Sequence, residues 1–514
     1  MMALTTLLLA ATFTRPMERI VTTDPAMVQS AYDLRAMKLL CQTVLTIDYE
    51  ARPYRLVPDA CELPEVSADG LTYRLRLRSP DLTAADVVRA MTRLADPAMP
   101  NGYLVKNVER AEARDARTVE VRLKRRQHVF PWMLALVGVL KADGSGTGPF
   151  VLSSWRKNHE MVFKRRKEVE KLGGQRNFNL HCPPPPSTST LFDTVRYLTV
   201  DDASTQWLMF LKGEVDMLGD VSRDNWDSVV TADGKLNPRL AADGVRLCET
   251  PLLDSMYLGI NMEDPVLGKN RKLRQALNCA FDFPAWAKFY HNSIERSDGP
   301  IPHGVDGRLE TPFAYAFDLE KAKRLMAEAG YPGGIDPQTG RRLVLTLSIG
   351  KASQESREAG ELTAAFFERI GVKLELAFMT WDAFLKAMNE RRCQLFRIGW
   401  VGDYPDAENF LQLFHSANVS PGANHSNYVN PEFDREYDAA MACGTAAERN
   451  EHWRKCQEII REDCPWIFTH YPKSYSLIRK RVGNYIPGAF PYGVEQYFEE
   501  RDEGSGMRNE KTGK

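Results

Sequence analysis

The chain has 514 residues, 43% apolar and 26% charged, a balance typical of a globular protein with two or three domains. No run of 18 uninterrupted apolar residues occurs, so no membrane-spanning helix is predicted. Lysine and arginine total 67 against 68 aspartates and glutamates, and the formal net charge of -1 argues against a nucleic-acid partner.

The N-terminus, MMALTTLLLAATFTRP, contains a short apolar core like that of a signal peptide, but the usual preceding basic residues are missing. We interpret residues 1–14 as an atypical signal segment; a plain apolar N-terminus is the alternative. RIVTTDPA, at 19–26, then predicts a short strand that ends in an Asp-Pro turn. VQSAYDLRAMKLL, at 28–40, has apolar residues at helical spacing.

Residues 41–140 have the pattern of a small α+β unit. DGLTYRLRLRS alternates strictly between apolar and polar residues after an Asp-Gly turn, which predicts a strand with one solvated face. TAADVVRAMTRLAD predicts a helix whose Thr83 and Asp86 have the spacing of a capping box. RTVEVRLK predicts a second alternating strand.

The middle of the chain contains loops and one predicted βαβ unit. GSGTGPFVLSSW at 144–155 lacks the Gly-Lys-Ser/Thr ending of a phosphate loop and indicates a turn before a strand. The proline run at 183–186 indicates an extended, exposed loop. FDTVRYLTV, ASTQWLMFLKG and EVDML then predict strand, helix and strand, with Trp207 and Met209 in or near the core.

The second half of the chain alternates clearly between helices and strands. Asp318 is a predicted N-cap and Gly330 follows the end of the same helix. RLVLTLSIG, VKLELAFM and CQLFRIGW predict strands, and the helical patterns ELTAAFFERIG and TWDAFLKAMNE lie between them. This order predicts an α/β fold with a mostly parallel sheet covered by helices.

The motifs of common enzyme classes are missing. No Gly-x-Ser-x-Gly, His-Glu-x-x-His, phosphate-loop or dinucleotide-binding pattern occurs, and the nine cysteines include no Cys-x-x-Cys pair. His415 and His425 flank a polar loop and are either metal ligands or, in our preferred interpretation, ordinary surface histidines. Asp403 and Asp406 suggest a glycosidase pair, but that role needs carboxylates on two sides of a sugar. We therefore expect no metal and no cofactor.

Several blocks, taken in order, resemble the bacterial extracellular solute-binding proteins of family 5, the peptide- and nickel-binding components of ABC importers. The resemblance extends from about residue 24 to about residue 497. The blocks that carry it are LVPDACELPEVSADGLTYRLRLRS, LTAADVVRAMTRLADP, GTGPFVLSSW, FLKGEVDML, YLGINMEDPVLGKNRKLRQALNCAFDFPAW and GPIPHG.

The resemblance implies a two-lobed α/β fold of the type II periplasmic-binding-protein class, with an extra α+β subdomain in the first lobe. Lobe I would comprise residues 15–40, 141–255 and 473–500, with the extra subdomain at 41–140. Lobe II would comprise 256–472, with hinges near 250–261 and 470–478, and the tail at 501–514 would be disordered. Closure around a ligand is an established motion of such proteins.

The resemblance also implies a set of ligand-binding residues. Asp403 in GWVGDYPDA matches the aspartate that pairs with the ligand's α-amino group in peptide-binding members; capping of the following helix is the alternative. Arg397 matches an arginine that some members place in the ligand cleft. Trp400 lines the cleft or belongs to the core. Asn261 and Tyr404 complete the set, with hinge hydrogen bonding as the alternative for Asn261.

We therefore expect a periplasmic or extracytoplasmic protein that catalyses no reaction. It would be monomeric, capture a short peptide or similar solute and deliver it to the permease complex of an ABC importer. An intracellular ligand sensor or scaffold on the same fold is the main alternative, suggested by the atypical leader and the nine cysteines. A hydrolase acting on a bound peptide or saccharide is a third hypothesis.

Overall fold

The structure is a computed structural model that describes residues 11–166 and 189–501. The first ten residues, the proline run at 183–186 and the tail after residue 501 lie outside this description. The chain divides into two compact units, residues 1–250 with 474–514 and residues 251–473. The chain therefore passes from one unit to the other twice. The finer domain limits given above remain predictions.

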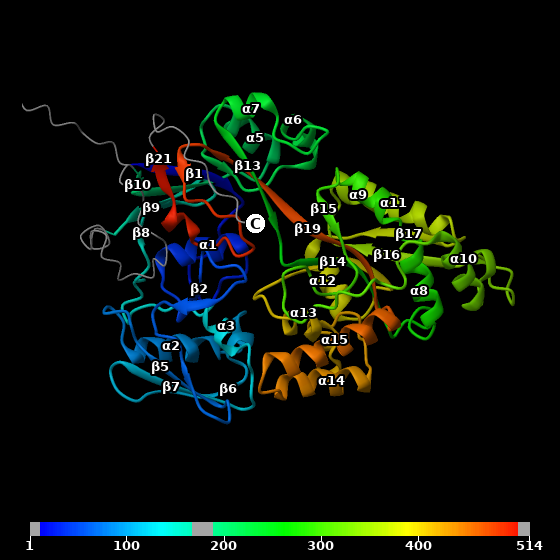
Figure 1. The fold of residues 1–514 in the computed structure, drawn as a ribbon, viewed down its shortest axis with the longest axis horizontal. Coiled ribbons are helices and arrows are strands. Elements are labelled where there is room, and N and C mark those ends of the chain that lie inside the picture. Colours follow the sequence, from blue (N-terminus) through cyan, green and yellow to red (C-terminus); the bar gives the residue numbers. More distant parts are fainter. Residues whose placement is uncertain (1–10, 167–188, 502–514) are drawn as a thin grey trace, which may run out of the picture. The chain divides into compact units, whose positions relative to one another are not determined.

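The first unit contains a four-stranded sheet and the helix α1, Ala31–Leu40. The sheet has the order β1-β11-β9-β8, and only the β1–β11 pair is parallel (Figure 1). Its strands are β1 (Thr12–Met17), β8 (Phe150–Arg156), β9 (Glu160–Arg165) and β11 (Thr194–Thr199). The helix lies within the range 28–40 predicted for it and begins three residues later than that range, with Ser30 as its N-cap.

The first strand of the chain does not lie where the sequence predicted it. No strand forms at 19–26, because the backbone N–H groups of Val21 and Thr22 donate to Asp33 Oδ1 instead of to a neighbouring strand. The strand is β1, in which Phe13 is fully buried. The limit of the predicted signal segment, at residue 14, therefore falls inside a strand that pairs with β11.

The predicted strands and helix of residues 41–140 are confirmed. Tyr73 and Leu75 are buried on one face of β5 (Thr72–Arg76), and Thr83 and Asp86 form the capping box of α2 (Ala84–Leu94). The strands β4, β5, β7 and β6 form an antiparallel sheet in that order. The elements are β2 (Leu45–Ile47), β3 (Leu56–Pro58), β4 (Glu65–Val66), β5 (Thr72–Arg76), α2 (Ala84–Leu94), η1 (Gly102–Val105), β6 (Val108–Ala113), β7 (Thr118–Leu123) and α3 (Phe130–Leu134).

The predicted βαβ unit is wrong, although its elements form. β11 belongs to the four-stranded sheet, whereas β12 (Met217–Leu218) pairs antiparallel with β19 (Trp466–Arg479), so β11 and β12 share no sheet. Trp207 and Met209 pack against the buried cluster around Phe210, as expected. The remaining elements of this unit are β10 (Ser189–Leu191), α5 (Ala203–Leu211), β12 (Met217–Leu218), η2 (Arg223–Asn225), α6 (Trp226–Val229), α7 (Pro238–Ala242), β13 (Val245–Pro251), β20 (Val482–Gly483), η6 (Val494–Tyr497) and β21 (Glu499–Arg501).

The second unit is built on a mixed sheet covered by helices. All three predicted strands form, and Asp318 caps α10 as expected. The elements are β14 (Asp254–Ile260), α8 (Arg271–Ala280), α9 (Phe283–Phe289), β15 (Ile294–Arg296), α10 (Leu319–Glu328), η3 (Pro332–Gly334), β16 (Val344–Ile349), α11 (Gln354–Glu368), β17 (Lys373–Phe378), α12 (Trp381–Asn389), β18 (Leu395–Val401), α13 (Glu408–Leu411), η4 (Gln412–Phe414), η5 (Ser416–Asn418), α14 (Pro431–Ala442), α15 (Ala446–Asp463) and β19 (Trp466–Arg479).

The prediction of a mostly parallel sheet is wrong. β16 is parallel to β17 and β18, but β14 is antiparallel to both β18 and β19, and β15 is antiparallel to β19. An apolar run indicates a buried strand but not the direction of the strand that pairs with it. The sequence pattern therefore could not distinguish parallel from antiparallel pairing. β16, β17 and β18 are joined in turn by α11 and α12, the kind of helical connection that parallel pairing requires.

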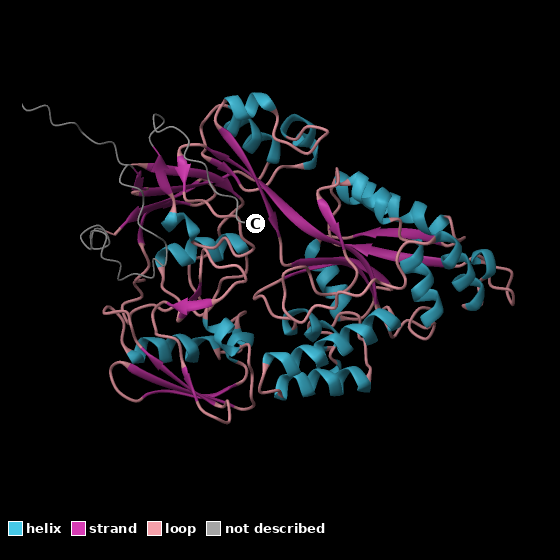
Figure 2. Ribbon diagram, viewed as in Figure 1, coloured by secondary structure: helices cyan, strands magenta, loops and turns pink. Residues whose placement is uncertain are grey.

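Helices of the second unit lie on both faces of this sheet (Figure 2). Residues of α8 to α11 form one core with β14, β16, β17 and β18, centred on Leu347, Phe367 and Leu395. On the other face, Phe414 packs against Trp466 with ring centroids 4.3 Å apart. In the part of the chain that the structure describes, no helix is long and apolar enough to cross a membrane.

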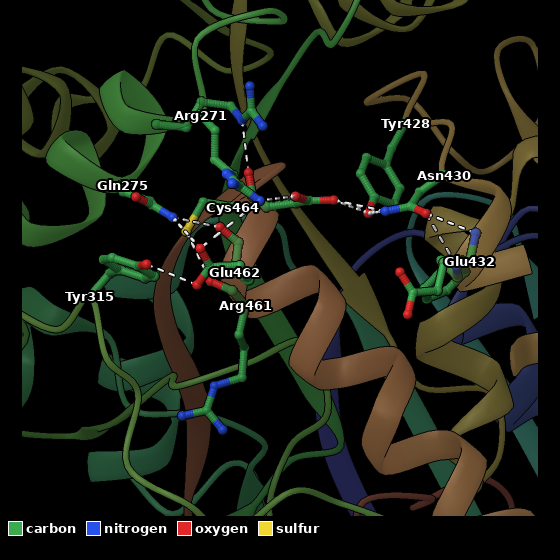
Figure 3. Close-up of polar contacts among 12 residues, drawn as sticks. Arg271, Gln275, Tyr315, Tyr428, Asn430, Glu432, Arg461, Glu462 and Cys464 are labelled. Carbon is green, nitrogen blue, oxygen red and sulfur yellow. Dashed lines mark hydrogen bonds and ion pairs between the residues drawn. The ribbon is translucent and has the colours of Figure 1, made fainter. Parts of the chain in front are cut away.

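The C-terminal end of α15 is held by a network of polar contacts (Figure 3). The Asp463 carboxylate accepts hydrogen bonds from the Tyr428 hydroxyl at 2.6 Å and from Asn430 Nδ2 at 2.9 Å. Arg271 lies 3.5 Å from the same carboxylate. Cys464 ends the helix in the left-handed conformation, with φ of 50°. These contacts fix the end of α15 before β19 begins.

None of the eight cysteines in the described residues forms a disulfide. Six of them are buried, and Cys248 and Cys443 are half-buried. Burial raises the pKa of the Cys41 and Cys61 thiols to about 12, so these thiols are poorly reactive.

Candidate functional site

One edge of the sheet in the second unit gathers the ends of several strands. β16, β17 and β18 are parallel, so their carboxyl ends meet at this edge. β14 is antiparallel to β18 and begins at the same edge, with Asp254 opposite Val401. In open α/β sheets, ligands bind beyond the carboxyl ends of strands. The loop after β18, which contains Asp403, lies in such a position.

Gly402 and Asn409 fix the conformation of this loop. The Gly402 N–H donates to Leu253 O at 2.8 Å, and a Cβ at this glycine would lie 2.4 Å from the same oxygen. Only glycine therefore fits there. The fully buried Asn409 accepts at Oδ1 from Trp400 Nε1 at 2.9 Å and from the Asp403 backbone N–H at 3.1 Å. A single buried amide thus joins Trp400 to Asp403.

The Asp403 carboxyl group is half-buried and unpaired. Burial raises its pKa to about 6, although the Asn409 side chain acts in the opposite direction. Within the described ranges, no cationic side chain forms an ion pair with it. It also caps no helix, because Asp406 Oδ1 accepts from the Glu408 N–H at 2.9 Å near the start of α13. This carboxylate can therefore accept a cationic ligand group.

Arg397 lies on the other face of the sheet from Trp400. The two positions are three apart in β18, and successive strand residues point to opposite faces. Arg397 Nη2 donates to the Tyr290 hydroxyl at 2.8 Å, and its guanidinium lies 5.6 Å from the Trp286 ring centroid. The structure thus joins Trp400 with Asp403 but places Arg397 in a separate cluster.

The Arg397 cluster is partly buried, with Trp286 and His470 inside and Glu355 exposed, and most of its polar groups bond to one another. The Tyr290 hydroxyl donates in turn to Glu355 Oε1 at 3.1 Å. Burial, and then the positive charge of Arg397, lowers the pKa of His470 to about 3, so this imidazole is neutral and accepts from Trp286 Nε1. Among the described residues, Arg397 Nη1 has no hydrogen-bond partner. The cluster therefore keeps one unused donor.

Asn261 is far from Asp403 and makes internal hydrogen bonds. It follows β14, at the end opposite to Asp254, so about 20 Å of strand separates it from the Asp403 loop. Its Nδ2 donates to Arg391 O at 2.9 Å, and its Oδ1 accepts from the Glu263 N–H and Asn427 Nδ2, both at 3.2 Å. In this structure Asn261 therefore makes structural hydrogen bonds, the alternative given above to a ligand contact.

Tyr404 is a core residue in this structure. Its side chain is 2% exposed, and its hydroxyl donates to Glu408 Oε2 at 2.5 Å. The Tyr437 hydroxyl donates to the other oxygen of the same carboxylate at 2.7 Å. These contacts hold the loop against α13 and α14, and the ligand contact of Tyr404 stays a prediction.

The two histidines considered as metal ligands lie in different surroundings. His415 Nε2 lies 3.5 Å from Asp438 Oδ1, and burial lowers the pKa of His425. In residues 11–166 and 189–501, no group of three or more His, Cys, Asp or Glu side chains is arranged to hold a metal ion. Neither histidine adds to the site around Asp403.

Sequence reasoning missed two residues of this edge. Asn409 was hidden inside a helical pattern, and Asp254 stands as an isolated acid at the start of the apolar run DSMYLGI. An acid at the first position of a buried strand is a weak signal that could have drawn attention to Asp254. No sequence signal predicts that Asn409 accepts hydrogen bonds from both Trp400 and Asp403.

Comparison with known proteins agrees with this architecture. The family model described as "Bacterial extracellular solute-binding proteins, family 5 Middle" matches residues 55–421. The chain belongs to this family and has the type II periplasmic-binding-protein fold. It is 25% identical to heme-binding protein A of Haemophilus influenzae over 497 residues, covering 87% of this chain and 84% of the relative.

Two further proteins illustrate the range of these relatives. The dipeptide-binding protein of Escherichia coli is 23% identical over 510 residues, which cover 89% of this chain and 88% of that protein. The solved structure of the periplasmic binding protein DppA from Helicobacter pylori, in complex with the peptide STSA, has a TM-score of 0.77 at 20% identity. That match covers 96% of this chain and 98% of the other.

Proposed function

We propose that this chain captures a short peptide, or a similar small solute, outside the cytoplasm and delivers it to an ABC importer. Its membership of solute-binding family 5 supports a binding role. The peptide is suggested by the dipeptide-binding relative and by the peptide-bound DppA structure. The importer and the location are suggested by DppA as well, since it is an ABC transporter-associated periplasmic binding protein.

The observation that carries the proposal is the unpaired carboxyl group of Asp403. A half-buried carboxylate without a cation is unfavourable, and a ligand ammonium would compensate it. Asn409 holds the Asp403 backbone and the Trp400 indole together, so the ligand would meet a charged group beside an aromatic one. We keep Arg397 as a candidate contact for a negatively charged ligand group, through its unused donor.

We also infer that the chain is monomeric and catalyses no reaction on its ligand. The family relatives are binding proteins, and Asp403 and Asp406 have separate roles, because Asp406 accepts from the N–H of Glu408. A peptide incubated with the protein should be recovered unchanged by mass spectrometry. If the peptide were hydrolysed, and if Asp403→Asn abolished the hydrolysis but not the binding, the hydrolase hypothesis would be supported instead.

Calorimetric titration tests the ligand class. We expect trialanine to bind and Nα-acetyl-trialanine to bind far more weakly, because acetylation removes the ammonium. Asp403→Asn should weaken trialanine binding by about 2 to 5 kcal/mol, the usual effect of removing one partner of a buried charge pair. Glu320→Gln, which removes an exposed carboxylate of α10, is the matched control and should bind normally.

A thermal-shift panel tests the alternatives to a peptide. It would include trialanine, glutathione and hemin. Stabilisation by hemin alone would overturn the peptide proposal. Fractionation of expressing bacteria tests the location, since a protein retained whole in the cytoplasm would favour the intracellular sensor.

A further inference from the structure

The first unit contains a pocket of its own, which we call the α2 pocket. It lies between α2, the turn at 24–27 and the segment 138–144, and its volume is about 180 Å³. Its walls are mainly apolar: Ala26 and Leu94 are buried there, and Leu140 is half-buried. A cavity of about 150 Å³ with apolar walls holds one benzene molecule. The α2 pocket therefore has room for one six-membered ring.

Polar contacts fix the three walls of the α2 pocket to one another. Arg93 of α2 donates to both carboxylate oxygens of Asp24, with N–O distances of 2.6 and 2.5 Å. One turn earlier in the helix, Arg89 Nη2 donates to Leu140 O at 2.9 Å and to Asp86 Oδ1 at 2.5 Å. The helix is thus tied to both loops, and the pocket is preformed, as small-molecule sites usually are.

The rim of the α2 pocket is positively charged. Arg89, Arg93 and Lys141 line it, and among the residues that the structure describes no acidic side chain does. Each arginine pairs with one aspartate just outside the lining, whereas Lys141 forms no ion pair with any residue in the described ranges. Asp143 lies beyond ion-pair distance of Lys141, and its Oδ1 accepts from the hydroxyl and the N–H of Ser145. One cation of the rim is therefore available to an anionic ligand group.

We propose that the α2 pocket binds a small carboxylate whose apolar body is a single six-membered ring. The ring would lie against Leu94 and Leu140, and the carboxylate would accept from the Lys141 ammonium. This ligand is distinct from the peptide, because the α2 pocket belongs to the first unit and Asp403 to the second. The inference therefore goes beyond the proposed function and does not depend on it.

Ligand-observed NMR at millimolar concentrations tests the charge class. Benzoate, benzyl alcohol and benzylamine carry a negative, a neutral and a positive group on the same ring. We expect benzoate to bind the unmodified protein at least about fivefold more tightly than benzyl alcohol, because a hydrogen bond to a charged group is stronger than a neutral one. Benzylamine should bind more weakly than either, since it brings a second cation to the rim.

Two pairs of variants place the binding in the α2 pocket. Ala90→Leu fills the pocket from α2 and should abolish benzoate binding, whereas Ala85→Leu adds the same side chain at an exposed position of the helix outside the lining. Lys141→Met should reduce the affinity for benzoate to that for benzyl alcohol. Its control is Lys235→Met, which removes an exposed lysine of the same unit. Both control variants should bind benzoate normally.

Three results would overturn the inference. They are an absence of benzoate binding to the unmodified protein, equal affinities for benzoate and benzyl alcohol, and benzoate binding that survives Ala90→Leu. If Ala90→Leu folds poorly, Lys141→Met decides instead, and a benzoate preference that survives this change would overturn the inference. Peptides take no part in these measurements, so failure of the proposed function and failure of this inference remain distinguishable.

Discussion

Two aspartates of the second unit show how differently this fold treats a carboxyl group. Asp463 accepts hydrogen bonds from Tyr428 and Asn430 and pairs with Arg271 at the end of α15. Asp403, at the carboxyl edge of the sheet, has no cationic partner among the described residues. The first carboxylate stabilises the fold, whereas the second is held at a cost and is available to a ligand.

The strongest test of this contrast is Asp463→Ala. The substitution leaves the Tyr428 hydroxyl and the Asn430 amide without their acceptor, so we expect the free energy of unfolding to fall by about 3 kcal/mol. Urea denaturation measures this change. Asp463 directly precedes β19, whose first residues pair with the C-terminal end of β14, whereas Asp254 is at the N-terminal end of β14. Peptide affinity at neutral pH should therefore stay within about twofold of that of the unmodified protein. A loss of peptide affinity without a loss of stability would contradict the contrast between a structural Asp463 and a ligand-binding Asp403.

A smaller loss of stability is expected for Tyr404→Phe. This change removes the hydroxyl that donates to Glu408 and leaves that buried carboxylate with fewer donors, which should cost about 2 kcal/mol in urea denaturation. Peptide affinity should be preserved, because Tyr404 is 2% exposed. The opposite result, unchanged stability with weakened binding, would support the prediction that Tyr404 contacts the ligand.

The smallest expected effect is a gain in stability, caused by Asp403→Asn. The pKa of Asp403 is raised from 3.8 to about 6, so folding favours the protonated form. Its contribution to stability therefore falls as pH rises from about 4 through 6 and stays low above that range. Asp403→Asn should thus stabilise the unliganded protein by about 1 to 2 kcal/mol at pH 7.5, with almost no gain near pH 4.

Urea denaturation of the unmodified protein and of Asp403→Asn at both pH values measures this difference in the free energy of unfolding. The other titrating groups are the same in both proteins, so their contributions cancel. A loss of stability at neutral pH would show that Asp403 has a structural partner and would remove the contrast with Asp463. Glu320→Gln should change stability by less than about 0.5 kcal/mol at either pH, because surface charges contribute little.

The elements of this fold were predictable where local signals are strong. Thr83 with Asp86 and Asp318 marked helix starts correctly, because a capping side chain bonds to a backbone group only two or three residues away. The directions of β14 and β19 were not predictable, since pairing depends on strands more than 100 residues apart. The start of β1 was missed for the same reason: its partner β11 lies far along the chain.

The candidate site was predictable only in part. The loop after β18 was located from its glycines and aspartates, and Asp403 has the unpaired carboxylate that a ligand contact requires. Asn261 accepts a hydrogen bond from Asn427, which lies far along the chain. Tyr404 donates to Glu408, and no local sequence pattern predicts either contact.

β18 supplies residues to both faces of the sheet, and this makes its length more constrained than its composition. Arg397 points toward α9, and Trp400 points toward α13. Deleting or inserting one residue within β18 would shift the register and exchange the two faces. The guanidinium would then meet the Asn409 side and the indole the Tyr290 side. Insertions and deletions within β18 should therefore be far more damaging than substitutions.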